Sequence, residues 1–352
     1  MPRKIPALVA LLLVTAPALA GPPGRAQVDA SIDKARKWLA ANQEVQTTGN
    51  WDCAKLGGRP SYDVGVTGLA VLALLGAGQG NPYAQNVDKG VEFLVKSQDR
   101  QGLCGGRASQ HFIYNHIMAT HALCEASART NKHKDPAQKA VNFLLSARNP
   151  FMGWRYGVRS GENDTSVTSW AIIALAAGQG AGLQVDPQAF TGAKAWMHKM
   201  TDPKFGQVGY IMPGSTSARP EGLIQVFPAE KTQAMTAAGI LTRLLSNEDA
   251  NAPAMQKSAK LIAELKPAWQ RPQIDMVFWH HGTFALSKMQ HQAWAPWRDA
   301  LAGTLVSNQK NDGSWDPAGP WGSDGGRVFS TALMAISLQK VARSLPQQKA
   351  QR

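Results

Sequence analysis

The chain has 352 residues, 44% of them hydrophobic, and a formal net charge of +13 at pH 7. That length is sufficient for one large hydrophobic core. Lys and Arg are spread along the chain, which favours a basic solvated surface over a specific acidic partner, and no recognisable motif indicates a nucleic-acid partner.

Residues 1–20 have the pattern of a secretory signal peptide. Arg3 and Lys4 supply the positive start, residues 5–14 are apolar, and residues 18–20 form a small-x-small cleavage site. The apolar run is too short for a stable membrane-spanning helix. We therefore expect an exported protein that resides in the periplasm or outside the cell.

A sequence motif recurs about every 50 residues. It consists of an amphipathic helix, a Gln, a Gly-containing loop and a second helix. It is clearest in residues 305–315, and earlier copies lie at 38–51, 93–104 and 143–154. A period of this size is typical of repeat architectures, in which one unit cannot bury its apolar face alone. Each copy therefore predicts a helical hairpin that packs on its neighbours.

Six helical pairs are expected along the chain. The first helix of each pair is amphipathic, with apolar residues at helical spacing, and the second is apolar nearly all round, which predicts burial on most sides. The first helices are expected at 28–42, 85–97, 135–147, 187–200, 252–266 and 296–308. The second helices are expected at 62–77, 112–128, 165–178, 230–246, 276–290 and 327–342.

Half-exposed first helices and buried second helices indicate two concentric rings. Six hairpins that close on themselves form an all-α fold, the α/α toroid, whereas an open solenoid needs polar capping repeats. Residues 201–229 form a long Gly- and Pro-containing loop, and long loops in compact domains are often functional. We expect residues 21–346 to form one toroidal domain, followed by a polar tail at 347–352.

The Cys and His residues give little support to a metal site. Cys53, Cys104 and Cys124 allow at most one internal disulfide, and similar places in successive loops favour the pair Cys53 and Cys104. No thiolate zinc pattern is present, and the three His between 111 and 121 are five residues apart, which does not place them on one helix face. We therefore expect neither a metal nor a cofactor.

The Gln-to-Gly-x-Trp phrases resemble the QW repeats of the squalene cyclase and protein prenyltransferase superfamily, most closely at Gln309, Gly313 and Trp315. The chain as a whole resembles secreted bacterial proteins with prenyltransferase and squalene-oxidase repeats. The stretches that carry this closer match are Tyr114-Asn115-His116, residues 163–170 and residues 313–317. The resemblance implies the toroid fold, but function depends on the sites that a fold carries.

Two motifs of the superfamily are altered in this chain. Squalene–hopene cyclases carry Asp-x-Asp-Asp-Thr-Ala, whose central Asp is the proton donor; residues 161–166 read Gly-Glu-Asn-Asp-Thr-Ser, so Asn163 takes that place. An amide does not supply the proton. Protein prenyltransferases bind zinc through Asp, Cys and His, and Ser330 stands where the His would be. The resemblance therefore implies the fold without standard cyclase or zinc prenyltransferase chemistry.

In such a toroid the amino ends of the inner helices surround one mouth of the central cavity. Here those ends concentrate polar and aromatic residues, including His111. The candidate cavity or ligand-binding residues are Tyr62, Asp63, Tyr114, Asn115, Asn163, Glu230, Lys231, Asp275, Trp279, His280 and Arg327. The candidate catalytic residues are Asp164 and His116, because buried carboxyl and imidazole groups can be tuned for acid–base work.

Several of these candidates also have a purely structural interpretation, because an Asp at a helix start is a common N-cap. The residues concerned are Asp63, Asp164 and Asp275 as helix caps, His116 and His280 as hydrogen-bonded core residues, and Glu230-Lys231 as a first-turn pair. The Trp residues that follow the repeat loops are interpreted as packing residues; they are Trp51, Trp154, Trp315 and Trp321.

The leading functional hypothesis is a ligand-binding or scaffold protein whose central cavity holds an apolar or isoprenoid-like molecule. The second is an enzyme. It is either terpenoid-cyclase-like, with Asp164 and His116, or carbohydrate-active, with Glu230 as a further acid–base group and with Trp279 and Tyr114 stacking on sugars.

The third hypothesis is a protein-interaction module that uses the outer ring and the 201–229 loop. The expected partners are thus an isoprenoid, lipid or glycan ligand or another protein, and not nucleic acid. The sequence leaves the oligomeric state open.

Overall fold

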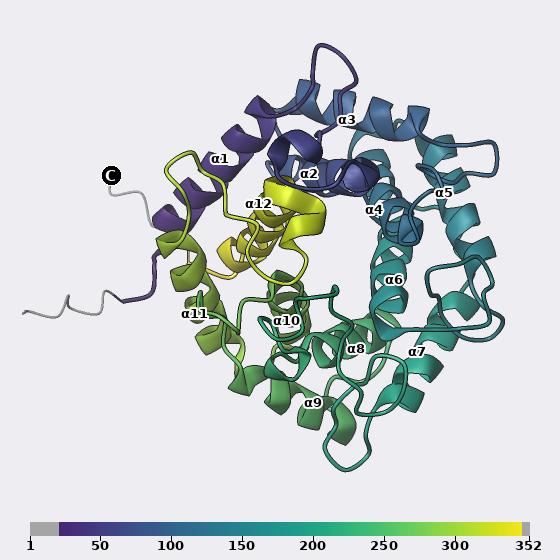
Figure 1. Ribbon diagram of the computed structural model, residues 1–352, viewed down its shortest axis with the longest axis vertical. Helices are drawn as coiled ribbons and strands as arrows, with labels where there is room; N and C mark the ends of the chain where they lie inside the picture. The colour runs from purple at the N-terminus through teal and green to yellow at the C-terminus, as the bar shows by residue number, and fades with distance from the viewer. Residues whose placement is uncertain (1–20, 347–352) are drawn as a thin grey trace, which may run out of the picture.

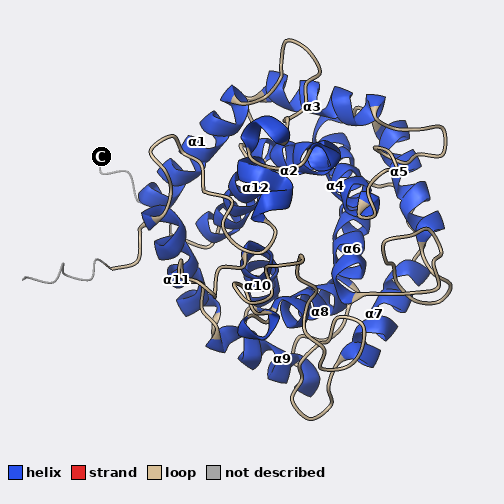
Figure 2. Cartoon of the chain, in the orientation of Figure 1, coloured by secondary structure: helices blue, strands red, loops and turns tan. Residues whose placement is uncertain are grey.

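The computed structural model describes residues 21–346, so the predicted signal peptide and polar tail lie outside the described residues. Within this range the chain forms twelve α-helices and no strand. The helices lie in two closed rings, one inside the other (Figures 1 and 2). The predicted all-α toroid is confirmed.

The helices alternate between the two rings along the chain (Figure 1). The outer helices are α1 (Arg25–Ala41), α3 (Ala84–Lys96), α5 (Lys134–Ala147), α7 (Gln188–Met200), α9 (Pro253–Glu264) and α11 (Trp294–Ser307). The inner helices are α2 (Asp63–Leu75), α4 (Phe112–Thr130), α6 (Thr165–Gly180), α8 (Ala234–Leu245), α10 (Met276–Met289) and α12 (Gly322–Ala342). Each inner helix contacts two inner neighbours, and α12 contacts α2, which closes the ring.

The burial pattern explains which ring each helix joins. In α3 the buried residues are Val87, Gly90, Val91 and Leu94, a single stripe at spacings of three and four. In α8 every residue from 234 to 244 is buried, so this helix is covered on all sides. Among the described residues, none of the helices combines the length and the hydropathy that a membrane span requires.

A Gln side chain after an outer helix ties one hairpin to the next. The Nε2 of Gln43 donates to the carbonyl of Gly49 in its own loop (2.7 Å) and to that of Asn86 in α3 (2.9 Å). Gln309 forms the same two bonds, one within its own loop and one with Ser31 of α1. The last hairpin is thus joined to the first by the bonds that join other neighbours.

The Trp residues of these loops are part of the packing. Trp51, Trp154 and Trp315 are fully buried. Their indole Nε1 groups donate to the carbonyls of the preceding outer helices, at Leu39 (2.7 Å), Leu144 (2.8 Å) and Leu305 (2.9 Å). The packing interpretation is confirmed for these three, whereas Trp321 is partly exposed and lines the central cavity.

Two inner helices begin at positions that differ from the prediction. Helix α8 begins at Ala234 because Thr232 is extended (φ −134°, ψ 158°) and separates it from a short 3₁₀ turn, η3 (Ala229–Lys231). The prediction that Glu230 and Lys231 lie in the first turn of an inner helix is therefore wrong. Both residues are exposed in η3.

Helix α12 begins at Gly322, before the expected position 327, and has a kink at Gly326 (φ 61°, ψ −162°). This conformation is essentially restricted to Gly. A Cβ here would also lie 2.5 Å from the carbonyl oxygen of Leu56. The kink gives the chain an extra turn, residues 322–325, before the long part of α12.

The three Cys residues are buried free thiols, so the expected pair Cys53 and Cys104 is not formed. The Sγ of Cys53 lies 3.9 Å from the carbonyl oxygen of Gly325, and that of Cys104 lies 3.9 Å from the Nε2 of Gln98. Each thiol therefore packs against a different part of the ring. Burial raises the pKa of the Cys104 thiol to about 12, which keeps it protonated.

Candidate functional site

The inner ring encloses a cavity that is open at the end where the inner helices begin. Each inner helix contributes at least one apolar side chain to its wall. These side chains are Leu69, Met118, Trp170, Met235, Val277 and Phe329, from α2, α4, α6, α8, α10 and α12. The empty space between the walls is about 920 Å³, including the part open to solvent. We call this space the inner cavity.

A more open and more polar space, the vestibule, lies outside the inner cavity. Six residues line both spaces, and we call this group the neck: Tyr62, His111, Tyr156, Ala218, Trp321 and Asp324. The vestibule is also lined by Arg59, Ser61, Ser109, Gln110, Arg219, Pro220, Glu221 and Gly222. The site is therefore apolar inside and polar at its mouth.

The long loop predicted at 201–229 forms part of this wall through Tyr210, Ser217 and Ala218. Arg219 holds the loop in place. Its Nη2 lies 2.9 Å from Asp275 Oδ2, and its Nε donates to the carbonyl of Phe227 (2.9 Å). The side chains of Arg219 and Asp275 are only 2% and 1% exposed, so this ion pair is buried.

Asp275 therefore anchors the loop and does not line the inner cavity. Its Oδ1 accepts a hydrogen bond from the backbone N–H of Phe278 (3.0 Å), which makes it the N-cap of α10. The structural interpretation is confirmed for this residue.

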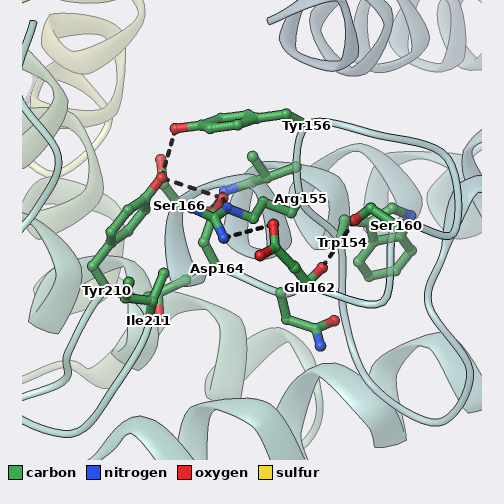
Figure 3. Close-up of polar contacts among 12 residues, drawn as sticks. Trp154, Arg155, Tyr156, Ser160, Glu162, Asp164, Ser166, Tyr210 and Ile211 are labelled. Atoms are coloured by element: carbon green, nitrogen blue, oxygen red, sulfur yellow. Dashed lines mark hydrogen bonds and ion pairs between the residues drawn. The ribbon is translucent and has the colours of Figure 1, made fainter. Parts of the chain in front are cut away.

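Asp164 is the N-cap of α6 and lies behind the cavity wall. Its Oδ1 accepts a hydrogen bond from Val167 N (2.7 Å), and the residue is fully buried. The Tyr210 hydroxyl donates to Asp164 Oδ2 (3.4 Å) and lies 2.6 Å from the Tyr156 hydroxyl (Figure 3). Both tyrosines line the cavity, so they stand between Asp164 and a ligand.

The environment of Asp164 favours its protonated form. Burial raises the pKa of the carboxyl to about 7, and its hydrogen bonds and the nearby Arg155 guanidinium oppose this rise only in part. The Arg155 Nε lies 3.9 Å from Asp164 Oδ2. Near neutral pH a large share of the Asp164 carboxyl is therefore protonated, whereas burial raises the pKa of the Tyr210 hydroxyl, which keeps its proton.

His116 does not lie beside Asp164. It is fully buried on the side of α4 that faces α5, and its Nδ1 accepts a hydrogen bond from Cys104 N (3.1 Å). Its Nε2 therefore carries the proton and donates to the carbonyl of Ala140 in α5 (3.1 Å). Burial lowers the pKa of this imidazole to about 4. The structure thus places His116 as a neutral core residue, outside the cavity lining.

Three of the predicted cavity residues do line the inner cavity: Tyr62, Tyr114 and Asn115. The Tyr114 hydroxyl donates to the Ser166 hydroxyl (2.9 Å) across the wall. The Asn115 side chain is already hydrogen-bonded to the backbone: its Nδ2 donates to the carbonyl of Ser61, and its Oδ1 accepts from Gly65 N.

The other predicted cavity residues are engaged elsewhere. The Asp63 carboxylate accepts from Cys53 N (2.9 Å), and the Asn163 side-chain oxygen accepts from Gly153 N (2.9 Å), so both hold repeat loops. Trp279 is 1% exposed in the core, and His280 stacks on Trp170. Arg327 pairs with Asp312 (2.6 Å). These partners keep the side chains from the inner cavity.

Sequence reasoning missed Tyr156, Tyr210 and Asp324. Asp324 was missed because the predicted start of the last helix excluded the turn before the Gly326 kink. Tyr156 and Tyr210 lie in loops, where helical periodicity gives no signal. Only the length of the 201–229 loop pointed toward Tyr210.

The zinc chemistry of protein prenyltransferases does not fit these residues. Within residues 21–346, no group of three His, Cys, Asp or Glu side chains has an arrangement suited to a metal ion. The Ser330 hydroxyl, at the position of the His ligand, is fully buried and donates to the carbonyl of Trp315 (2.7 Å). The Ser330 side chain thus holds the loop around Trp315 in place.

Comparisons with known proteins agree with the toroid. The family model for the squalene-hopene cyclase C-terminal domain matches residues 52–201. The squalene–hopene cyclase of Bradyrhizobium diazoefficiens is 28% identical over 178 residues, which cover 42% of this chain and 26% of that protein. The chain thus spans only about a quarter of the length of this curated relative.

Two solved structures are similar over nearly their whole length. The apo type II terpene cyclase MstE from Scytonema has a TM-score of 0.60 at 14% identity and covers 92% of this chain and 100% of its own. An α-1,6-mannanase from Salegentibacter sp. HEL1_6 has a TM-score of 0.61 at 13% identity, with coverages of 91% and 100%. At these identities the likeness shows the fold alone. Together with the family and sequence matches, it supports a place for the chain in the squalene cyclase/prenyltransferase-like superfamily of helical toroids.

Proposed function

We propose that this protein binds an apolar, isoprenoid-like ligand in the inner cavity. The observation that carries the proposal is the contribution of an apolar side chain by every inner helix to one cavity, with the polar groups gathered at the neck and vestibule. Ligand sites are typically concave and mostly apolar, with a few polar groups that set orientation.

A neighbour in structure supports the same ligand class. One variant of MstE is described in complex with geranylgeranyl dihydroxybenzoate, its substrate. That ligand has a long isoprenoid chain and a polar aromatic end. An isoprenoid chain of similar length would place its methyl and methylene groups against Leu69, Met118 and Phe329 in this protein, where each buried CH₂ contributes about 0.8 kcal/mol.

Glycoside hydrolysis has less support in the geometry. It usually needs two carboxyl groups on either side of the bond that is cleaved. Among the described residues, Asp324 is the one carboxylate that lines the inner cavity, and Glu221 reaches only the vestibule. Two other carboxylates were considered for this role. Asp164 is fully buried, and Glu230 is exposed in η3.

The second candidate is a terpenoid-cyclase-like activity, favoured by the contact from Asp164 through Tyr210 to the cavity. In that reaction the Asp164 carboxyl would pass its proton to the Tyr210 oxygen as the Tyr210 hydroxyl proton moves to an alkene carbon, whose π electrons form the new C–H bond and leave a carbocation. The negative charge that remains on the protein would be the Asp164 carboxylate, and Tyr210 would stay neutral throughout. Conversion of an isoprenoid by the wild type that is lost in Asp164→Asn would support this candidate; equal conversion by both would exclude it.

We also propose that the protein acts after export as one toroidal domain whose loops are QW repeats. The charge and hydropathy pattern of residues 1–20 supports export. The recurring bonds of Gln43 and Gln309 and the buried Trp51 and Trp315 support the repeat assignment. Amino-terminal sequencing of the protein from a periplasmic or culture fraction tests cleavage after Ala20.

Native mass spectrometry tests the leading proposal. The chain from residue 21 is purified without detergent from a host that makes isoprenoids, and its native and denatured masses are compared. The proposal predicts an added mass of isoprenoid size that is lost on denaturation. A ligand-free native mass that stays unchanged after incubation with geranylgeraniol would contradict it.

A further inference from the structure

We infer that the ligand carries an uncharged, hydroxyl-bearing head group that is bound at the neck, and that the site excludes prenyl diphosphates. This inference rests on the proposed function and names the class of isoprenoid that the same site selects. It follows from the hydrogen-bonding groups at the neck and from the charges around the vestibule.

The position of the neck determines where a head group would lie. Its six residues line both the apolar inner cavity and the polar vestibule. A ligand whose chain fills the inner cavity would therefore place its polar end among Tyr62, His111 and Asp324. Trp321 offers the same end a partly exposed aromatic ring.

The hydrogen-bonding groups at the neck are mainly neutral. The Tyr62 hydroxyl lies 3.0 Å from His111 Nδ1, and the Gln110 side-chain nitrogen lies 3.4 Å from His111 Nε2. Burial raises the pKa of Tyr62 to about 12 and lowers the pKa of His111, so both side chains are uncharged at neutral pH. Neutral hydroxyl and imidazole groups are suited to exchange hydrogen bonds with a ligand hydroxyl.

The cations near the vestibule are already paired. Arg59 Nε lies 3.2 Å from Asp324 Oδ1, and the Arg59 backbone N–H donates to the Asp324 carbonyl (2.9 Å). Arg219 is buried against Asp275. Glu221 adds a further negative charge to the vestibule lining. Diphosphate sites need Arg or Lys that remain available for the anion, and this lining offers none without a carboxylate partner.

The amino ends of α6, α10 and α12 provide no substitute here. Backbone N–H groups at such ends often bind phosphates. In α6 and α10, carboxylates of the protein itself occupy these groups, because Asp164 accepts from Val167 N and Asp275 accepts from Phe278 N. In α12 the first turn carries Asp324. The capped N–H groups of α6 and α10 are therefore already hydrogen-bonded, and at α12 a diphosphate would meet the Asp324 carboxylate.

Three probes with similar apolar bodies test the inference. They are geranylgeraniol, geranylgeranyl diphosphate and the parent hydrocarbon, which lacks only the hydroxyl group of geranylgeraniol, and binding is followed by intrinsic fluorescence because Trp170 and Trp321 line the cavity. We expect geranylgeraniol to bind at least tenfold more tightly than the diphosphate. The parent hydrocarbon, which has no head group, should bind several-fold more weakly than the alcohol because it forms no hydrogen bond at the neck.

Asp324→Asn is the informative variant, because it removes the neck carboxylate and releases Arg59. It should strengthen diphosphate binding about tenfold and weaken geranylgeraniol binding. The matched control is Glu264→Gln, which removes the same charge from an exposed position on outer helix α9. It should change neither the affinity for the diphosphate nor that for geranylgeraniol. Tyr62→Phe keeps all charges and should weaken only geranylgeraniol, by several-fold. Thermal melting of each variant verifies that it is folded.

The outcomes separate the two proposals. If none of the probes binds to the wild type, the proposed function itself fails. If the diphosphate binds as tightly as geranylgeraniol, the cavity assignment stands and the exclusion of diphosphates is overturned. If the parent hydrocarbon binds as tightly as the alcohol, or if Asp324→Asn and Glu264→Gln behave alike, the neck does not recognise a head group and the inference is overturned.

Discussion

The amino ends of α6 and α10 differ from that of α12 in how they use a carboxylate. At α6 and α10 the Asp precedes the helix, bonds to backbone N–H groups and is buried. At α12 the kink at Gly326 separates the first turn from the rest, and Asp324 lines the cavity. A polar residue at an inner-helix end thus becomes available to a ligand only where the local backbone does not bind it first.

The same contrast separates two His residues near the start of α4. His116 bonds to the backbone of Cys104 and Ala140 and is fully buried. His111 directly precedes the helix, and its partners are the side chains of Tyr62 and Gln110 at the mouth. The first arrangement stabilises a hairpin, and the second leaves an imidazole beside the vestibule.

The largest effect is expected from breaking the buried pair that holds the 201–229 loop. Arg219→Met leaves Asp275 without its cation in a buried position, so the free energy of unfolding should fall by about 3–5 kcal/mol. Denaturant unfolding measures this loss. The double variant with Asp275→Asn should lose less than the sum of the two single variants, and strict additivity would show that the pair is not coupled.

A second large effect is expected at the kink that presents Asp324. Gly326→Ala places a Cβ 2.5 Å from the Leu56 carbonyl oxygen and strains the backbone, so it should cost roughly 3 kcal/mol and reduce binding at the neck. Gly303→Ala on α11 is the control, because its Cβ meets no atom closer than 4.0 Å. Similar melting temperatures for both variants would contradict the role given to the kink.

Because Asp164 is a buried acid, it should make the free energy of unfolding fall as the pH rises. Its folded pKa of about 7 lies above the unfolded value of about 3.9. Its contribution is therefore fully present below about pH 4 and is lost as the pH rises to about 7, by roughly 4 kcal/mol. Asp164→Asn keeps a capping oxygen and removes this dependence.

Thermal melts of the wild type and Asp164→Asn between pH 4.5 and 7.5 test this assignment. The wild type should lose stability relative to the variant as the pH rises. A difference between the two proteins that stays constant over this range would show that Asp164 is ionised throughout.

The smallest effects should separate the two His residues. His111→Gln should weaken geranylgeraniol binding by about 1 kcal/mol with little change in stability, because His111 bonds side chains at the neck. His116→Gln should instead lower the melting temperature, since it disturbs a buried bond between α4 and α5. Equal effects of the two variants on binding would remove the distinction between them.

The fold could be predicted from the sequence because its determinants are local and repeated. Apolar spacing indicated both rings, and the Gln and Trp positions indicated the loops that join hairpins. The candidate site was predicted only in part. Tyr62, Tyr114 and Asn115 line the cavity, whereas most other candidates bond to backbone groups or pack in the core.

The residues that sequence reasoning missed depend on conformations without a periodic signal. Asp324 reaches the cavity through a positive φ at Gly326, and Tyr210 reaches it from a long loop, where its carbonyl accepts a hydrogen bond from Thr165 N (3.0 Å). Asn163 shows the converse. It replaces a catalytic residue of related cyclases, and its side chain holds Gly153 in a repeat loop.

Photo-crosslinking with a diazirine derivative of geranylgeraniol tests the central claim most directly. After irradiation of the purified chain, peptide mass spectrometry locates the label. We expect labels on inner helices, at or near Met118 and Met235, that are competed away by unlabelled geranylgeraniol. Labels confined to exposed apolar residues such as Met212, which is 61% exposed, and insensitive to competition would contradict it.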